Sequence, residues 1–173
     1  MKKRTLFNEI IKALILLVIG GAIYYVIEIA WDGSSHWSMA VTGGTCFLIG
    51  DLLDEFKGFK LMIRTEVFII SAVITVLEFL VGVVVNLILH LDVWDYSSMY
   101  LNIGEVSIPM HIMGQVSIPF VLLWTFIFAP FIIFFGNYLR WELFDKKNPM
   151  KFIEVYKSFI FGREYEASVW RRE

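Results

Sequence analysis

Four long apolar stretches make up most of this sequence and restrict it to folds that a lipid bilayer can surround. A helix that crosses a bilayer needs about 20 mostly apolar residues, and the stretches near this length are residues 10–30, 37–53, 67–91 and 116–139. Composition also argues against a soluble domain, because 58% of the residues are apolar and 18% are charged, against about 45 to 50% and about a quarter in soluble domains. The sequence therefore predicts an all-α fold, a polytopic integral membrane bundle of four transmembrane helices.

The basic residues predict the orientation of this bundle. All 15 Lys and Arg residues fall in the N-terminal region, the second connection or the region after the fourth stretch, and such residues favour the cytoplasmic side. The first connection and the loop at residues 92–115 have none, so we expect both outside. Four crossings with both termini in the cytoplasm fit this pattern. The second stretch is the weakest, since it has 17 residues and is interrupted early by Asp51. We expect the first stretch to be a retained anchor rather than a cleaved signal peptide.

The composition changes after residue 141, so we divide the chain into a membrane domain, residues 1–141, and a cytoplasmic tail, residues 142–173. Beyond Pro149 the apolar residues recur at helical spacing, with charged residues on the other faces: Phe152, Ile153, Tyr156, Phe159 and Ile160. This pattern predicts an amphipathic C-terminal helix. The helix can lie on the inner leaflet or pack against the cytoplasmic ends of the bundle, and the sequence leaves both arrangements open.

A polar stripe runs along the third apolar stretch and marks the candidate site. Steps of four, three, four and four residues place its members on one helix face: Ser71, Thr75, Glu78, Gly82 and Asn86. An ionisable side chain at mid-membrane costs about 2.5 kcal/mol or more and usually faces protein or water. Since no Lys or Arg lies in the middle of a span, we expect the Glu78 carboxyl group to be uncharged.

Two interpretations of Glu78 remain open. It forms a site for a ligand, an ion or a proton, with Thr75 and Asn86 beside it, or it is a hydrogen-bond link between two helices. Four short spans enclose little volume, so we expect a second copy of the chain or a partner membrane subunit to cover this carboxyl group.

The loop at residues 92–115 begins with Trp94, Asp95 and Tyr96 and then leads into two near-copies of one motif. The copies, ten residues apart, read Ile103-Gly104-Glu105-Val106-Ser107-Ile108-Pro109 and Met113-Gly114-Gln115-Val116-Ser117-Ile118-Pro119. Glycine permits a bend and proline favours extended backbone, so we predict a duplicated turn-and-extended unit. The first copy is then an extra hairpin or a short re-entrant element. We expect the whole loop to cap the bundle from outside.

Motifs for catalysis, cofactors and metals are missing from the sequence. It has no GxSxG, HExxH, GxxxxGK[ST] or GxGxxG pattern, so we predict no enzymatic activity and no cofactor, and any ATPase would be a separate chain. The three histidines, His36, His90 and His111, lack metal-site spacing, and the single cysteine, Cys46, excludes an intramolecular disulfide. Nucleic acid is not an expected partner, because the basic residues are spread over three segments. Anionic membrane lipids are expected partners.

Several short motifs are weak individually and specific in combination: Ser35-His36-Trp37-Ser38-Met39, Leu77-Glu78-Phe79-Leu80, Val93-Trp94-Asp95-Tyr96-Ser97 and Gly114-Gln115. Through them the sequence, over residues 36–141, resembles a bacterial membrane family labelled "putative ABC-transporter type IV". The resemblance implies a multi-pass protein of the bacterial cytoplasmic membrane and suggests a role in transport. Either copy of the loop motif can occupy the position where this family has its Gly-Gln pair. The last span ends as Asn137-Tyr138-Leu139-Arg140-Trp141, so we expect no acidic partner for Arg140 next to it in the sequence.

These observations lead to two functional hypotheses. The first is a small transport-associated protein, permease-like or substrate-binding, in which ligand contacts come from the stripe, the loop and the outer edge: Glu78, Asn86, Thr75, Trp94, Asp95, Tyr96, Gln115 and His36. The second is a non-transporting scaffold or accessory subunit in which the polar stripe is an assembly face. An intramembrane enzyme is the least favoured alternative, because no nucleophile is paired with a base at a recognisable spacing.

Overall fold

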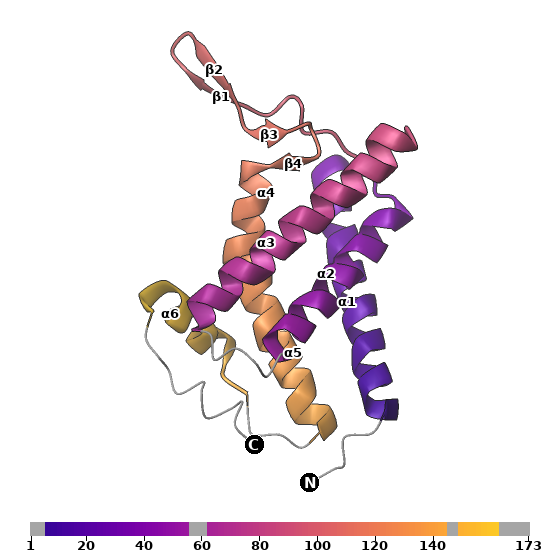
Figure 1. Cartoon of the computed structure of the whole chain (residues 1–173), viewed down its shortest axis with the longest axis vertical. Coiled ribbons are helices and arrows are strands. Elements are labelled where there is room, and N and C mark those ends of the chain that lie inside the picture. Colours follow the sequence, from indigo (N-terminus) through magenta and orange to yellow (C-terminus); the bar gives the residue numbers. More distant parts are fainter. Residues whose placement is uncertain (1–5, 56–61, 145–148, 163–173) are drawn as a thin grey trace.

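The structure is a computed structural model that describes residues 6–55, 62–144 and 149–162 (Figure 1). Three helical rods cross the length of the bundle. The first is α1 (Leu6–Asp32), the second is α3 (Ile63–Gly82) with η1 (Val83–Ile88), and the third is α4 (Ile118–Leu123) with η2 (Trp124–Phe128) and α5 (Ala129–Phe144). The shorter helix α2 (Trp37–Glu55) lies beside them. The segment η2 is a π-helical turn between α4 and α5, whereas η1 is a π-helical turn that ends the rod begun by α3. We call the end that carries residues 89–117 the loop end, and the end where α1 begins and α5 ends the terminal end.

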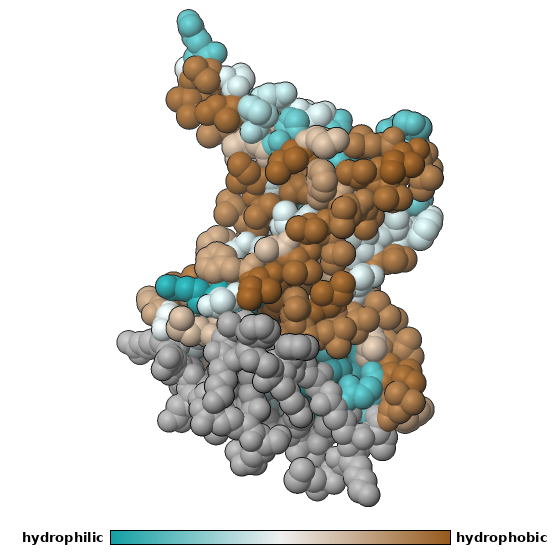
Figure 2. All heavy atoms as spheres, in the orientation of Figure 1, coloured by the Kyte–Doolittle hydropathy of each residue, from teal (hydrophilic) through white to brown (hydrophobic). Residues whose placement is uncertain are grey.

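The three rods are long and apolar enough to cross a bilayer, over Leu6–Ala30, Ile63–Ile88 and Ile118–Leu143. Helix α2 is apolar only over Trp37–Leu53, which is shorter than the usual span. The structure therefore supports three of the four predicted spans by length and composition, and the fourth, α2, is the one that the sequence already marked as weakest. Figure 2 shows apolar residues over most of the middle of the bundle, where side chains such as Val18, Val76 and Ile127 face outward. Lipid is the environment that suits such a surface.

Helices α1 and α2 pack very closely because glycine removes the side chain at their contacts. A Cβ atom added at Gly44 would overlap the carbonyl oxygen of Leu17, and one added at Gly21 would overlap that of Ala40. Small residues allow such backbone approach between helices. Glycine therefore serves close packing of α1 and α2 at these positions. The same contact fixes α2 against a longer helix, although α2 itself is short.

The loop contains all strands found in the described residues, so the prediction of an all-α fold needs a correction here. Strands β1 (Tyr100–Ile103) and β2 (Val106–Pro109) form one antiparallel hairpin, and β3 (His111–Ile112) and β4 (Val116–Ser117) form a second. Each copy of the repeated motif supplies one turn, with glycine at positive φ: Gly104 at 61° and Gly114 at 73°. The first copy is thus a hairpin rather than a re-entrant element. Its strands are exposed and project beyond the bundle (Figure 1), whereas β4 is buried against it.

Helix α6 (Phe152–Phe161) packs against α3 and α5 near the terminal end. It buries Val155, Ser158 and Phe159, and it leaves Ile153 and Ile160 exposed. The Arg64 side chain, at the start of α3, donates hydrogen bonds to the carbonyl oxygens of Phe159 (3.1 Å) and Ile160 (2.7 Å). The structure thus shows contact with the bundle, and contact with the inner leaflet stays a prediction. Of the predicted apolar face, Phe159 is the member that the bundle covers fully.

Candidate functional site

Glu78 lies in the last turns of α3, four residues before its end at Gly82, with 1% of its surface exposed, and three aromatic side chains surround its carboxyl group. The indole nitrogen of Trp124 donates a hydrogen bond to Oε2 over 2.7 Å. The hydroxyl groups of Tyr24 and Tyr96 lie 3.3 and 3.4 Å from Oε1. These partners come from η2, from α1 and from the loop, so one carboxyl group connects three separate parts of the chain to α3.

The two oxygens of the Glu78 carboxyl group have different kinds of hydrogen-bond partner. An indole N–H can only donate, so Oε2 is fixed as an acceptor, whereas a tyrosine hydroxyl can donate or accept. A proton on Oε1 can therefore be donated to a hydroxyl, and an unprotonated Oε1 can accept from one. Within the described residues, all hydrogen-bond partners of Glu78 are uncharged. The site can thus satisfy the carboxyl group with or without its proton.

Aromatic rings form the walls around this carboxyl group. Tyr24 stacks on Trp124 with 5.2 Å between ring centroids, and Tyr96 stacks on Phe120 at 4.7 Å. Toward the terminal end, Tyr24 and Trp124 border an apolar cavity of water-molecule size, and its remaining lining residues are Gly43, Cys46, Phe47, Ile74, Phe128 and Ile132. The Glu78 carboxyl group therefore lies between the loop and a small internal space.

Both π-helical turns lie next to this site. Turn η1 follows Glu78 on the same rod and contains Asn86, and η2 contains Trp124 and Thr125. Such turns are rare and are found often at functional positions, because they interrupt the regular hydrogen-bond pattern of the helix. Thr125 contacts Ser71 of the polar stripe through their hydroxyl groups, 2.5 Å apart. The rod that contains Glu78 and the rod that contains its closest hydrogen-bond donor, Trp124, thus both depart from regular α-helix near the carboxyl group.

A second polar group, which we call the cap cluster, consists of Asn86, Val93, Trp94 and Gln115. The Asn86 amide nitrogen donates to the Gln115 side chain (2.8 Å) and to the Trp94 carbonyl (3.0 Å), and its oxygen accepts the Val93 N–H (2.8 Å). The indole of Trp94 donates to the backbone carbonyl of Gln115 (3.0 Å). These bonds hold the loop over the end of α3 and place Tyr96 against Glu78. The prediction that the loop caps the bundle is confirmed for this part.

The predicted site residues divide into two groups. The structure brings together Glu78, Asn86, Trp94, Tyr96 and Gln115, as described above. The other three make their hydrogen bonds elsewhere, and none is bonded to the carboxyl group: Thr75 to the carbonyl of Ser71 (2.8 Å), His36 to Ser38 (2.8 Å), and Asp95 to the backbone and hydroxyl of Ser97 (2.8 and 2.6 Å). A role of these three residues in contacting a ligand stays a prediction.

Asp95 is exposed at the loop end and has a local role instead. The hydroxyl and the backbone N–H of Ser97 hold the pKa of Asp95 below its ordinary value, and His111 acts in the same direction. Gly114 lies directly beneath the carboxylate, where a Cβ atom would meet Oδ1. Asp95 thus orders the turn that leads from Tyr96 into the hairpins.

Sequence reasoning missed three residues at or near the Glu78 site. Tyr24 and Trp124 stand in apolar spans, where an aromatic residue gives no signal of a polar contact. Glu28 carried a signal, since it is an ionisable residue in an apolar span, as Glu78 is. It is 4% exposed and lies one turn beyond Tyr24 on α1. A second buried carboxyl group therefore lies one helical turn from the site.

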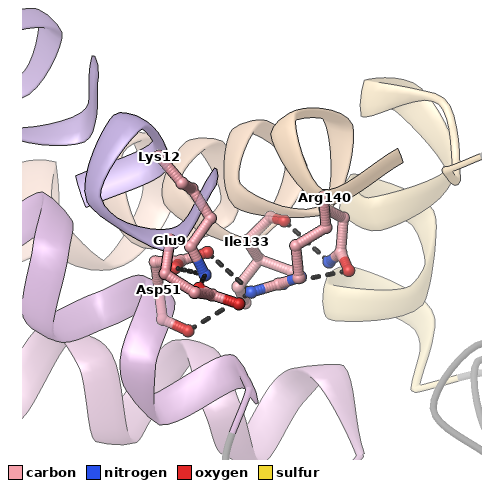
Figure 3. A network of polar contacts seen from close by, with 6 residues as sticks. Glu9, Lys12, Asp51, Ile133 and Arg140 are labelled. Atoms are coloured by element: carbon pink, nitrogen blue, oxygen red, sulfur yellow. Dashed lines mark hydrogen bonds and ion pairs between the residues drawn. The ribbon is translucent and has the colours of Figure 1, made fainter. Parts of the chain in front are cut away.

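A third polar group at the terminal end, which we call the Asp51 cluster, consists of Glu9, Lys12, Asp51, Asn137 and Arg140. Figure 3 labels Glu9, Lys12, Asp51 and Arg140. The Asp51 carboxylate is fully buried and pairs with Arg140 through Oδ1 (2.6 Å) and with Lys12 through Oδ2 (2.9 Å). Glu9 lies 3.6 Å from Lys12, and Arg140 donates to the Asn137 side chain (3.0 Å). Arg140 thus has an acidic partner after all, supplied by α2. From the sequence, Asp51 only marked the end of a short apolar stretch, and this position did not indicate Arg140 as its partner.

The described residues contain no group of three His, Cys, Asp or Glu side chains that could hold a metal ion. The comparisons with known proteins match residues 4–162 to a protein family described as "Putative ABC-transporter type IV". Neither the curated proteins nor the solved structures gave a match. The family match includes all three polar groups and bears out the resemblance seen in the sequence motifs. The chain therefore belongs to the "Putative ABC-transporter type IV" family, and it is a membrane protein with an association with transport.

Proposed function

We propose that this chain is a membrane component of a transport system and that Glu78 is its polar centre, where a proton or a polar ligand is bound and released. The observation that supports the proposal is the arrangement of donors around the carboxyl group. One oxygen is fixed by Trp124, while the other faces two hydroxyl groups that accommodate either protonation state. A purely structural carboxyl group would need no such reversible partner.

The same arrangement couples the site to the loop. Tyr96 reaches Glu78 from a loop that the cap cluster holds in place. When Oε1 gains or loses a proton, the hydrogen bond with the Tyr96 hydroxyl changes direction or breaks. The loop end would then respond to the occupancy of a site inside the membrane, as transport requires.

Several further parts of the proposal concern location and partners. We place the protein in the cytoplasmic membrane with both termini inside, on the distribution of its basic residues. We infer no catalytic reaction for the chain, and ATP hydrolysis would belong to a separate subunit. Assembly with a second copy or a partner subunit is retained, but burial of Glu78 does not require it, because Ser71, Glu78 and Asn86 are all buried within one chain.

The second candidate function is a non-transporting accessory subunit. One observation favours it: the polar side chains of the stripe all have hydrogen-bond partners within the chain, as a structural network would. In this form of the hypothesis the stripe holds the bundle together, and assembly uses other surfaces. The two functions differ in whether anything exchangeable is bound at Glu78.

Native mass spectrometry of the protein in nanodiscs distinguishes the two functions, with wild type beside Glu78→Gln. The substitution keeps the size and the acceptor oxygen of the side chain but removes the exchangeable proton. Transport predicts a retained small molecule that is lost in Glu78→Gln, or, where the proton itself is the ligand, an infrared band of a protonated carboxyl group that is lost in the variant. Glu66→Gln is the matched control, because Glu66 is an equally buried glutamate on α3. An unchanged spectrum with a less stable protein would favour the accessory subunit.

A further inference from the structure

The Asp51 cluster and the Glu78 site lie on either side of one internal cavity. Tyr24 and Trp124 border the cavity and bind Glu78. On the opposite side, Ile132 borders the cavity and packs on Gly50, where a Cβ atom would overlap its side chain. Asp51 is the next residue of α2. A layer of about one side chain therefore separates the cavity from the buried ion pairs at the terminal end.

One carboxylate closes this end of the bundle. Asp51 belongs to α2, Lys12 to α1 and Arg140 to α5, and the pairs Asp51–Lys12 and Asp51–Arg140 are both shorter than 3 Å. Side-chain exposure is 0% for Asp51, 2% for Lys12 and 6% for Arg140. Three helices are thus held together at the terminal end by charges that have no direct access to water.

Buried ion pairs of this kind favour two discrete states over gradual loosening. Removing charges from water costs several kcal/mol per ion, and their attraction repays this only when the geometry is good. When the pairs separate, the charges are stabilised again only by full hydration. The cluster is therefore stable when it is closed and dry or when it is open and wet, and intermediate separations are unfavourable. A gate requires this behaviour.

We propose that the Asp51 cluster is the gate that closes the cavity below Glu78 on the terminal side of the bundle. Separation of Asp51 from Arg140 moves α5 away from the closely packed α1–α2 pair and admits water to the cavity. This inference rests on the proposed function, since a gate matters only for a site that exchanges its ligand. The gate adds to that function the route by which water or a ligand reaches Glu78, which runs through the terminal end of the bundle rather than through the loop.

Gly136 offers a way to disturb the gate without removing a charge. Its Cα lies against Asp51, so the Cβ atom of Gly136→Ala would overlap Oδ1 of the carboxylate. The three atoms nearest to that Cβ position all belong to the Asp51 side chain, so the carboxylate must shift from its place beside Arg140. Asp51→Asn acts differently, because it leaves Lys12 and Arg140 without their shared anion. Both variants should favour the open gate.

The single native cysteine reports the state of the gate. Cys46 lines the cavity, is 4% exposed, and lies five residues before Asp51 on the same helix. In nanodiscs, a charged, membrane-impermeant thiosulfonate reagent should modify wild-type Cys46 slowly. We expect modification at least about tenfold faster in Asp51→Asn and in Gly136→Ala, because a buried pair that loses its geometry is strongly destabilised.

A second thiol separates gate opening from loss of the fold. Ser71→Cys in a Cys46→Ser background places a thiol at an equally buried position of α3 that does not line the cavity. Rapid modification at position 46 with slow modification at position 71 supports the gate. Equal acceleration at both positions, or no acceleration at position 46 in either gate variant, overturns it. Wild-type Glu78 is present throughout, so this result is independent of the Glu78→Gln comparison that tests the proposed function.

Discussion

Trp124 donates its indole N–H to Oε2 of Glu78 over 2.7 Å, from a π-helical turn on the opposite rod of the bundle. This is the shortest hydrogen bond that the carboxyl group makes, and its direction does not depend on the protonation state, since an indole nitrogen cannot accept. Trp124 therefore holds the carboxyl group in place while the two tyrosine hydroxyl groups adapt to changes at Oε1. The division between a fixed and an adaptable oxygen is the central feature of the site.

Trp124→Phe should destabilise the bundle by about 1 to 3 kcal/mol, because it leaves a buried carboxyl oxygen without its donor while most of the ring packing stays. Thermal unfolding in detergent, followed by the loss of soluble monodisperse protein, measures the change. Trp37→Phe is the control, since Trp37 is 68% exposed and its ring lies at the bundle surface. Equal effects of the two substitutions would contradict the assigned role of Trp124.

Asn86→Ala should release the loop from the bundle. It removes the donor to Trp94 and Gln115 and the acceptor for the Val93 N–H, and it leaves those buried groups unsatisfied. Hydrogen exchange followed by mass spectrometry should show faster exchange in residues 93–97 and 114–117. Asn102→Ala serves as the control, because Asn102 lies in the exposed hairpin, where its side-chain oxygen accepts a hydrogen bond from the Ser107 hydroxyl. Unchanged exchange in Asn86→Ala would mean that the cap is held by other contacts.

The turn at Asp95 should weaken at acid pH. Its pKa is lowered by the hydrogen bonds from Ser97 in the folded protein, so the ionised carboxylate stabilises the turn above the ordinary Asp value of about 3.9, and this contribution is lost as the pH falls through the folded value. A pH titration of the Ser97 backbone amide by NMR should follow this loss. Asp95→Asn should abolish the transition and Asp92→Asn should leave it in place. A titration that persists in Asp95→Asn would assign it to another group.

The loop and helix α6 should lie on opposite sides of the membrane. In a Cys46→Ser background, a thiol introduced by Ser98→Cys in the exposed loop should react with an impermeant maleimide in intact cells. One introduced by Lys157→Cys on the exposed face of α6 should react only after the cells are permeabilised. Labelling of both positions in intact cells, or the reverse order, would contradict the orientation inferred from the basic residues.

The sequence predicted the outline of the site because its signals are local. Glu78 is conspicuous in an apolar span, and Asn86 follows it on the same helix face by periodicity alone. The loop was predicted to cap the bundle, and its residues Trp94, Tyr96 and Gln115 lie against this face. Thr75 shares the face, but its hydroxyl bonds to the Ser71 carbonyl, because sharing a helix face does not determine which side chains touch the carboxyl group.

The partners of Glu78 and Asp51 could not be predicted in the same way. Tyr24 and Trp124 lie 54 and 46 positions from Glu78, and Arg140 lies 89 positions from Asp51. Each contact depends on how one helix is rotated about its axis and how far it is shifted along its neighbour. Packing of many side chains sets these two quantities together, so no local pattern encodes them.

The repeated Val-Ser-Ile-Pro segment shows the same limit within four residues. In the first copy, Val106–Pro109 is an exposed strand, whereas in the second, Val116–Ser117 is a buried strand and Ile118 begins α4. The sequence by itself determined the apolar spans, the buried glutamate and the repeated turns, because these follow from the cost of polar groups in lipid and from glycine and proline geometry. Only the tertiary structure decided which copy enters the bundle and which side chains meet, since burial against other helices selects among conformations that the local sequence leaves nearly equal in energy.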